Sequence, residues 1–521
     1  MLFKRNRGAV IGLIIGLIIG GWAFGKVQVS GENTYQELNL FVEVLSKVKA
    51  HYAEEVDTAK LIRGAIDGML RELDPHSQYL DVKQYGELRD MTQGSYGGLG
   101  ISIWVRDGYP TVISPMEGTP AYSMGIQSGD RIERIEGKNT YKMSMDDILS
   151  KLRGPKGTRV TFSVRREGDP ELIDYTITRD IIKLKSVPYS FSMGSGIGYV
   201  RLSSFSEDTG EELTEALNKL AKDAGKGLLL DLRGNPGGLL TQAVEVSEKF
   251  VPAGKPVVET KGRATGQTRT YYSSSPEVYT APLIILINEA SASASEIVAG
   301  CVQDLDLGLV VGMTSFGKGS VQTVESLKDG KALKLTTAYY YTPSGRLINN
   351  REHNTALLGG DQGQEEAKSE TEKEKPMFHT SAGRVVYGGG GITPDIVIER
   401  EAPKVSDSIR RRGYFFDFAV RYGGKHKDIG KDFEAGDAVL QEFRQFLKEK
   451  EFTVDEKEFE GEKARIALEI RAEIMRRFFG DEAAFREMMK ADNQLQTAVG
   501  LFSRASNLAQ LLKLAEERKG H

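Results

Sequence analysis

The spacing of apolar residues changes several times along the 521-residue chain. Over residues 33–92 apolar positions recur every three or four residues, as they do from Leu38 to Val48, which predicts amphipathic helices. Residues 94–185 instead carry short β-branched runs divided by glycine turns, with one helix-like insert. This second pattern predicts a small, β-rich module.

Residues 186–400 alternate strand-like and helix-like patterns. The runs "GLLLDLRG" and "APLIILIN" are almost continuously apolar, which is typical of parallel strands buried on both faces. Repeated β-α units of this kind predict a mostly parallel sheet covered by other elements. Within this core, residues 350–380 are polar and lack periodicity, so we expect a flexible insertion there. Helical patterns dominate residues 403–521.

The N-terminal segment, residues 1–25, has the pattern of a targeting sequence. Lys4, Arg5 and Arg7 precede the uncharged run "GAVIGLIIGLIIGGWAFG" of residues 8–25. A membrane anchor and a cleaved signal peptide both fit this pattern, and we favour the anchor. Because a basic flank stays in the cytoplasm, we expect the rest of the chain in the periplasm or cell envelope.

Composition narrows the classes of partner. The formal net charge of −4 gives no reason to expect a nucleic-acid partner. The one cysteine, Cys301, excludes an intrachain disulfide framework, and we expect its side chain to be small and buried rather than reactive.

The stretch "INEASASASEIVAG" is the first that could carry chemistry, because it holds three serines at alternate positions, Ser291, Ser293 and Ser295. A buried strand, a small-residue turn and a helix place a side chain above the end of a sheet, beside backbone donors, as an acyl-transfer nucleophile requires. Ser293 and Glu296 also fit an S-x-x-E capping box, so an ordinary helix start remains an alternative.

A nucleophilic serine needs a base, and none of the six histidines lies in the β-α part of the predicted core, because His353 and His379 flank its polar insertion. Lysine is a recognised substitute for histidine. The segment "GMTSFGKGSVQT" offers Lys318 between two glycines, although a solvated loop lysine is the alternative. To act near neutral pH, its pKa must fall from about 10.4 towards 7–8, which burial would favour.

The same segment approaches a phosphate-binding loop, since Gly312, Gly317 and Lys318 have the required spacing. Gly319 stands where that motif needs Ser or Thr, and the following residues predict strand–turn–strand rather than a helix. We therefore expect no nucleotide partner. A third stretch, "LLLDLRGNPGGLL", places a glycine-rich turn after a buried strand, where it supplies oxyanion donors or simply turns the chain.

Together these stretches resemble the carboxyl-terminal processing peptidases, the tail-specific serine proteases of the S41 family, and the β-rich module resembles a PDZ domain. Eight strings carry the resemblance over about residues 34–400: "LDPHSQYL", "GGLGI", "LRGPKGT", "IGYVRLSSFSEDT", "DLRGNPGGLL", "SASASEIVAG", "SFGKGSVQ" and "GITPD". It implies a multidomain α/β fold in which a PDZ domain (94–185) separates an N-terminal helical region (33–92) from a crotonase/ClpP-like protease core (186–400), followed by a C-terminal helical region (403–521).

The resemblance also implies roles for single residues. Ser293 would be the nucleophile, Lys318 its general base, and Gln322 the residue that orients the lysine. The oxyanion hole would use two backbone N–H groups, those of Ala294 and Gly238, with Gly237 the alternative to Gly238. No metal ion or other cofactor is implied.

In the PDZ-like module, the resemblance implies a loop that cups the carboxylate of a peptide added as a strand. Its residues are Gly98, Leu99, Gly100 and Ile101. Leu99, Ile101 and Ile148 would either line a pocket for the last side chain or belong to the module's core. Arg153 is a candidate for coupling peptide capture to the protease core.

We therefore expect a serine endopeptidase that recognises the C-terminal tails of protein substrates through its PDZ domain and processes or degrades envelope proteins. The alternative is a catalytically silent PDZ scaffold that binds C-termini. Besides these substrates, the expected partners include the membrane, through residues 8–25, while a homo-oligomer and a regulatory adaptor remain open.

Overall fold

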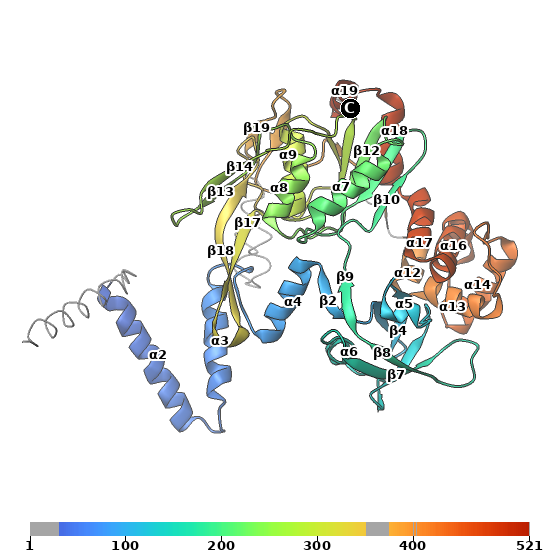
Figure 1. Cartoon of the computed structure of the whole chain (residues 1–521), viewed down its shortest axis with the longest axis horizontal. Coiled ribbons are helices and arrows are strands. Elements are labelled where there is room, and N and C mark those ends of the chain that lie inside the picture. Colours follow the sequence, from blue (N-terminus) through green and yellow to red (C-terminus); the bar gives the residue numbers. More distant parts are fainter. Residues whose placement is uncertain (1–30, 351–374, 400, 403, 520–521) are drawn as a thin grey trace, which may run out of the picture. The chain divides into compact units, whose positions relative to one another are not determined.

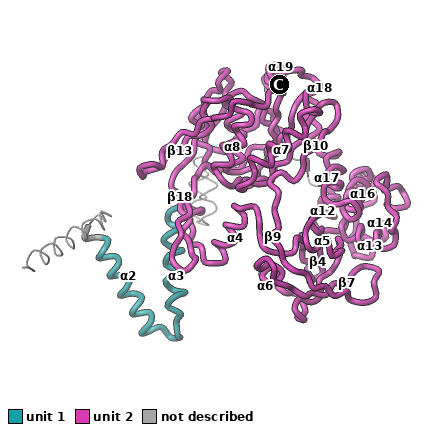
Figure 2. Tube along the Cα trace, viewed as in Figure 1, with its two compact units in different colours: residues 1–73 teal, residues 74–521 magenta. Residues whose placement is uncertain are grey.

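The computed structural model describes residues 31–350, 375–399, 401–402 and 404–519. The chain divides into two compact units, residues 1–73 and 74–521, which Figure 2 distinguishes by colour. In the described part of the first unit lie helices α2 (Gly31–His51) and α3 (Thr58–Arg71). The Asp57 side chain caps α3 by accepting hydrogen bonds from the N–H groups of Ala59 and Lys60.

The second unit begins with a turn and strand β1 (Gln78–Leu80), followed by helix α4 (Val82–Gln93). The region 33–92 is therefore largely helical as predicted, but β1 is not a helix: it pairs with a strand more than 250 residues further along the chain.

The PDZ-like module contains the predicted short strands and single longer helix. Strands β2 (Ser95–Gly98) and β9 (Asp180–Lys183) pair at its entrance and exit. A sheet of order β3-β4-β5-β7-β8, with β6 paired to β5, forms its body and leaves β3 as an edge strand. The other elements are β3 (Ile101–Arg106), β4 (Tyr109–Pro115), α5 (Pro120–Ser123), β5 (Arg131–Ile135), β6 (Lys138–Asn139), α6 (Met145–Leu152), β7 (Arg159–Arg165) and β8 (Ile173–Thr178).

The core holds a six-stranded sheet in which all neighbours from β11 onward are parallel and only β10 is antiparallel, as the apolar runs predict. Its strands are β10 (Tyr189–Ser192), β11 (Ile197–Arg201), β12 (Gly227–Asp231), β15 (Leu283–Ile287), β16 (Leu309–Gly312) and β21 (Ile396–Val397). The helices between them are α7 (Thr209–Leu220), α8 (Leu240–Glu248) and α9 (Ala294–Asp304).

Alternate residues of the buried strands point to opposite faces of this sheet. Leu230 and Ile285 pack towards α7, α8 and α9 on one face (Figure 1). Leu229 and Ile284 pack on the other face against the C-terminal helices α18 (Asn493–Arg504) and α19 (Leu508–Lys519). The C-terminal region therefore completes the protease core.

A second, antiparallel sheet has the order β1-β18-β13-β14, with β17 also paired to β18. Strands β17 (Ser320–Ser326) and β18 (Ala332–Tyr341) form the strand–turn–strand predicted after Lys318, which confirms that no helix follows the lysine. The other strands are β13 (Pro256–Gly262) and β14 (Arg269–Tyr272). Most of the predicted flexible insertion lies outside the described residues, but its end forms strand β19 (Met377–His379), which pairs with β20 (Val385–Tyr387).

The remaining C-terminal helices share a separate hydrophobic core. They are α12 (Val405–Arg411), α13 (Tyr414–Lys425), α14 (Asp437–Glu449), α15 (Glu456–Gly461), α16 (Lys463–Phe479) and α17 (Asp481–Met488). Arg106 of β3 binds Asp417 of α13, and Ser114 of β4 donates to Asp481 of α17 at 2.8 Å. These hydrogen bonds and ion pairs join the helices to the PDZ-like module.

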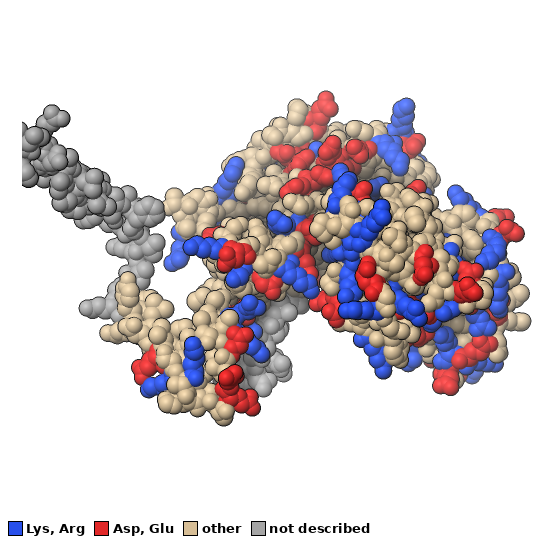
Figure 3. All heavy atoms as spheres, turned by 60° about the horizontal axis from the view of Figure 1, so that its bottom comes forward, with Lys and Arg blue, Asp and Glu red and all other residues tan. Residues whose placement is uncertain are grey.

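On the face in Figure 3, Lys and Arg side chains alternate with Asp and Glu side chains over the described residues. No helix within these residues is both long and apolar enough to cross a membrane. The predicted anchor, residues 8–25, lies outside the described part of the chain.

Candidate active site

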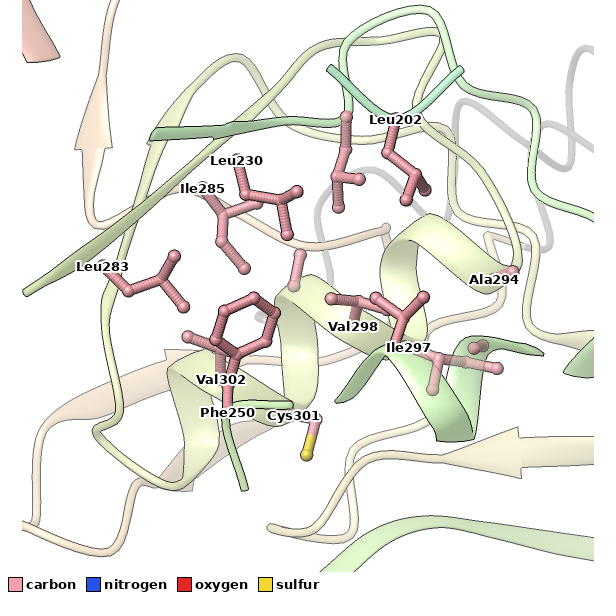
Figure 4. Close-up of a cluster of buried hydrophobic side chains, with 14 of the residues drawn as sticks. Leu202, Leu230, Phe250, Leu283, Ile285, Ala294, Ile297, Val298, Cys301 and Val302 are labelled. Carbon is pink, nitrogen blue, oxygen red and sulfur yellow. The ribbon is translucent and has the colours of Figure 1, made fainter. Parts of the chain in front are cut away.

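The serine-rich stretch forms the turn between β15 and α9, above the carboxyl end of the parallel sheet. Ser293 has φ 55° and ψ −113°, a conformation that non-glycine residues rarely adopt and that costs about 1–3 kcal/mol. Such backbone strain clusters at functional sites, and here the buried helix behind the turn maintains it. Figure 4 shows apolar side chains of α9 in the core, among them Ile297, Val298 and Cys301.

The three serines have different partners. The Ser291 hydroxyl donates to the Leu232 carbonyl at 2.9 Å, and the Ser295 hydroxyl donates to the Asn235 carbonyl at 3.0 Å. Both hydroxyls are buried and tie the turn to the chain after β12. The Ser293 side chain is only half-buried, starts α9 in a capping box with Glu296 and hydrogen-bonds the Tyr340 side chain.

Glu296 connects the serine turn to the lysine loop. Its fully buried carboxylate accepts from the Ser293 N–H at 2.7 Å, as the capping-box pattern predicts, and from the Lys318 N–H at 2.9 Å. The Ser315 hydroxyl and the Gly317 N–H donate to its other oxygen at 2.6 and 2.7 Å. Burial raises the pKa of Glu296, but four donors around an acceptor-only group favour its ionised form.

Lys318 lies in the loop between β16 and β17, with its side chain half-buried. Burial lowers the pKa of Lys318, and the charge of Lys334 lowers it further, whereas Glu296 and Asp74 oppose this shift. Lys318 forms no salt bridge within the described residues. The lysine therefore has the direction of pKa shift that a general base near neutral pH requires.

Tyr340, fully buried on β18, also contacts both segments. Its hydroxyl donates to the Lys318 carbonyl, and its side chain is hydrogen-bonded to Ser293. The sequence reasoning missed Tyr340, because a tyrosine in the run "TAYYY" shows only that a strand is expected.

Gln322 lies on β17, four residues after Lys318. Its amide nitrogen donates to the Ser320 hydroxyl at 2.9 Å and to the Thr336 hydroxyl at 3.3 Å. These bonds turn the amide nitrogen towards β18, and within the described residues the amide oxygen accepts no hydrogen bond. That oxygen is available to a lysine amine, although no bond to Lys318 is formed.

The glycine turn after β12 lies directly against the serine turn. A Cβ placed on Gly237 would lie 2.7 Å from Ser293 Cβ and 2.9 Å from Ala294 N. The Gly237 N–H donates to Asn235 Oδ1 at 2.9 Å, whereas the N–H groups of Gly238 and Ala294 donate no hydrogen bond within the described residues. Of the two glycines, Gly238 is thus the one whose N–H has no acceptor within the described residues, while its predicted role in an oxyanion hole stays a prediction.

In the PDZ-like module, Gly98 ends β2, Ile101 begins β3, and the loop between them leaves the N–H groups of Leu99 and Gly100 without an acceptor in the described residues. The Leu99 side chain is 2% exposed and packs in the module's core with Ile148, and Ile101 packs partly against it. Of the two expectations for these residues, a peptide pocket or the module's core, Leu99 and Ile148 therefore fit the core.

Arg153 follows α6, and its guanidinium lies 4.4 Å from the ring centroid of Tyr96 in β2. The next residue, Gly154, donates its N–H to the Gly97 carbonyl at 3.1 Å. Arg153 thus contacts β2, the strand that leads into the loop before β3. Its coupling to the protease core stays a prediction.

His76 lies in the turn before β1, and β1 pairs with β18. Its backbone N–H donates to Asp74 Oδ1 at 2.7 Å. Neither Asp74 nor Lys334 was a candidate from the sequence, since nothing local distinguishes them from other charged residues.

Comparison with protein families divides the chain in the same order. Residues 196–354 match Peptidase family S41, and residues 111–166 match the PDZ domain. Residues 24–84 match the activating protease CtpB N-terminal domain, and residues 405–460 match the C-terminal helical domain of a probable PDZ-protease.

Similar curated proteins carry names of the same kind. The carboxy-terminal-processing protease of Bartonella bacilliformis is 39% identical over 378 residues, which cover 72% of this chain and 77% of the relative. The carboxy-terminal processing protease CtpA of Bacillus subtilis is 36% identical over 63% of this chain and 69% of the relative. The solved photosystem II D1 C-terminal processing protease aligns at 27% identity with a TM-score of 0.38, over 72% of this chain and 97% of that one. By this similarity the chain belongs to Peptidase family S41, and it is a serine-type peptidase of the carboxy-terminal processing proteases that carries a PDZ domain.

Proposed function

We propose that the chain hydrolyses peptide bonds with a Ser293–Lys318 dyad. Neutral Lys318 takes the proton from the Ser293 hydroxyl as its oxygen attacks the substrate carbonyl, and returns that proton to the leaving amine. Water then attacks the acyl-enzyme as Lys318 accepts its proton, and Lys318 returns that proton to the Ser293 oxygen as the bond to the acyl group breaks. Gln322 orients the amine through its free amide oxygen, and the N–H groups of Ala294 and Gly238 bind the oxyanion.

The observation that carries this proposal is the double role of Glu296. One carboxylate oxygen accepts from the N–H groups of both Ser293 and Lys318, so the two residues are held at a common point although 25 positions separate them. A lysine loop with an unrelated role would need no such connection to the serine turn. Ala294 follows this serine and Gly237 lies against it, and within the described residues the N–H groups of Ala294 and of Gly238, the neighbour of Gly237, have no acceptor.

We further propose that substrates are captured by their C-termini. The N–H groups of Leu99 and Gly100, which have no acceptor within the described part of the chain, suit a terminal carboxylate, and the adjacent edge strand β3 suits an added peptide strand. The substrates would be envelope proteins, because Lys4, Arg5 and Arg7 precede an apolar segment of anchor type. The placement is tested with a reporter that is active only in the cytoplasm, fused after Lys26. Activity of this fusion would contradict the placement.

The dyad is tested with a serine-directed acylating reagent and a quenched peptide that ends in an apolar residue. The reagent should label Ser293, identified by mass spectrometry, and Ser293→Ala and Lys318→Ala should each lower turnover by about 10⁴-fold or more. Ser503→Ala and Lys328→Ala, at exposed positions, are the matched controls. Turnover by Ser293→Ala at a rate near that of the parent would exclude the dyad.

A further inference from the structure

The motif "DPHSQYL" has no role in the mechanism described so far, yet it lies beside the catalytic strands. Asp74 Oδ1 accepts from the N–H groups of His76 and Ser77 at 2.7 and 2.8 Å, and the Ser77 hydroxyl donates to Oδ2 at 2.8 Å. The turn therefore holds its own carboxylate in place. The next residue, Gln78, pairs with Lys334 where β1 adds to β18.

A hydrogen-bonded chain leads from this turn to Gln322. The Thr336 N–H donates to the Ser77 hydroxyl at 3.1 Å, across 259 positions of sequence. The Thr336 hydroxyl in turn accepts from the Gln322 amide at 3.3 Å. Ser77 thus binds the residue of β18 whose hydroxyl accepts from the Gln322 amide nitrogen, while within the described residues the Gln322 amide oxygen accepts no hydrogen bond.

The turn and β18 also carry charged side chains that act on Lys318. Lys334 is half-buried on β18, opposite Val324 of β17, and therefore lies beside the Gln322–Thr336 pair. The charges around Lys318 act in opposite directions: Lys334 lowers its pKa in addition to burial, whereas Glu296 and Asp74 raise it. Burial raises the pKa of Asp74, but the hydrogen bonds from Ser77 and His76 outweigh it, so Asp74 is charged at neutral pH.

We propose that Asp74, Ser77 and Lys334 are positioning residues of the active site. The Asp74–Ser77 turn holds Gln322 in place through Thr336, and the opposite charges of Asp74 and Lys334 balance each other around Lys318. The proposal rests on the function proposed for Lys318.

The two charges have opposite effects on the pH dependence of the rate. A lysine base acts when neutral, so kcat/KM rises as pH increases through its pKa. Lys334→Met removes a like charge, which raises the pKa of Lys318 and moves the acidic limb of the profile to higher pH. Asp74→Asn removes an opposite charge and moves the limb to lower pH, while it keeps an acceptor for the turn. Each shift should be on the order of half a pH unit or more.

Among the described residues, the charged groups that act on Lys318 are Glu296 from α9, Lys334 from β18 and Asp74 from the turn before β1, and the Tyr340 hydroxyl of β18 binds the Lys318 carbonyl. Glu296 and Tyr340 are unchanged in the test variants. The double variant Asp74→Asn/Lys334→Met should therefore return the limb close to its original position.

The experiment measures kcat/KM against pH on the full chain with a quenched peptide, together with circular dichroism to establish folding. Lys328→Met and Asp329→Asn, exposed at the tip of the same hairpin, repeat the chemical changes away from the site and should leave the profile unchanged. Ser77→Ala should lower kcat about tenfold or more without moving the limb, and Ser77→Thr should restore it.

Opposite shifts for Asp74→Asn and Lys334→Met support the proposal, and shifts of the same sign or no shift overturn it. If Asp74→Asn does not fold, Lys334→Met and the two Ser77 variants still decide between these outcomes. Failure of the underlying function looks different: Lys318→Ala would then remain active. If Lys318→Ala is inactive but neither Asp74→Asn nor Lys334→Met moves the acidic limb, only the present inference is rejected.

Discussion

At the scale of single residues, Glu296 does more than the capping box predicts, because its fully buried carboxylate accepts from four donors, two of which lie in the serine turn and the lysine loop as the backbone N–H groups of Ser293 and Lys318. Its carboxylate accepts from the backbone N–H groups of Ser293 and Lys318 rather than binding their side chains. It therefore positions the two residues and takes no part in proton transfer. Small misplacements of reacting groups reduce rates steeply, which makes such a contact important to the rate.

We predict that Glu296→Gln lowers kcat by about 10²-fold and destabilises the fold by about 2 kcal/mol. Glutamine keeps the shape but replaces one acceptor oxygen with an NH₂ group, which opposes two donors. Turnover and urea unfolding measure both effects, with the exposed Glu277→Gln as control. Unchanged kcat in a folded Glu296→Gln protein would show that the backbone contact is dispensable.

At the scale of elements, the site is assembled from loops that follow neighbouring parallel strands. The glycine turn follows β12, the serine turn follows β15, and the lysine loop follows β16. In open α/β sheets the carboxyl ends of the strands are the usual place for a site, because successive loops converge there. Asn235 joins two of them, since its carbonyl accepts from the Ala292 N–H at 3.0 Å.

The contact between the glycine turn and the serine turn leads to a second prediction. Gly237 has φ 96°, and an added Cβ would lie 2.7 Å from Ser293 Cβ, so Gly237→Ala should displace the nucleophile. We expect kcat and the rate of serine acylation to fall by about 10²-fold. Gly225→Ala, where a Cβ meets nothing within 4 Å, should behave like the parent. Equal acylation rates in the two variants would contradict the predicted displacement.

At the scale of the second unit, charged groups join the protease core to the C-terminal helices. Arg233, just after β12, binds both the buried Asp231 and Asp492, which caps α18, at 2.7 Å each. Burial opposes ionisation of Asp231, but the Arg233 and Arg201 guanidinium groups and the Tyr199 hydroxyl lower the pKa of Asp231 to about 2. The Asp231 carboxylate thus also orders Arg233, which binds Asp492 at the start of α18.

This shift predicts a pH-dependent contribution to stability. Because the pKa of Asp231 is about 2 in the folded chain, against an ordinary 3.8, the contribution is present above about pH 4 and is lost as pH falls towards 2. It amounts to about 2 kcal/mol. Asp231→Asn should therefore be less stable than the parent at pH 7 and approach it near pH 2, as followed by urea unfolding. A difference that is constant with pH would refute this, and the exposed Asp223→Asn is the control.

The succession of helical, β-rich, alternating β-α and helical regions, the mostly parallel core and the β-hairpin after Lys318 could be predicted from local periodicity. The candidates Ser293, Lys318, Gln322 and Gly238 came from the resemblance to the S41 family, which short motifs in the chain carry. Tertiary structure decided which distant groups meet: Glu296 with Lys318, Tyr340 with Ser293, and Ser77 with Thr336. It also decided that Gly238, rather than Gly237, keeps a free N–H, and that α18 and α19 cover the second face of the sheet. A hydrogen bond between residues 259 positions apart leaves no periodic trace in the sequence, because it depends on strand pairing that only the folded chain establishes.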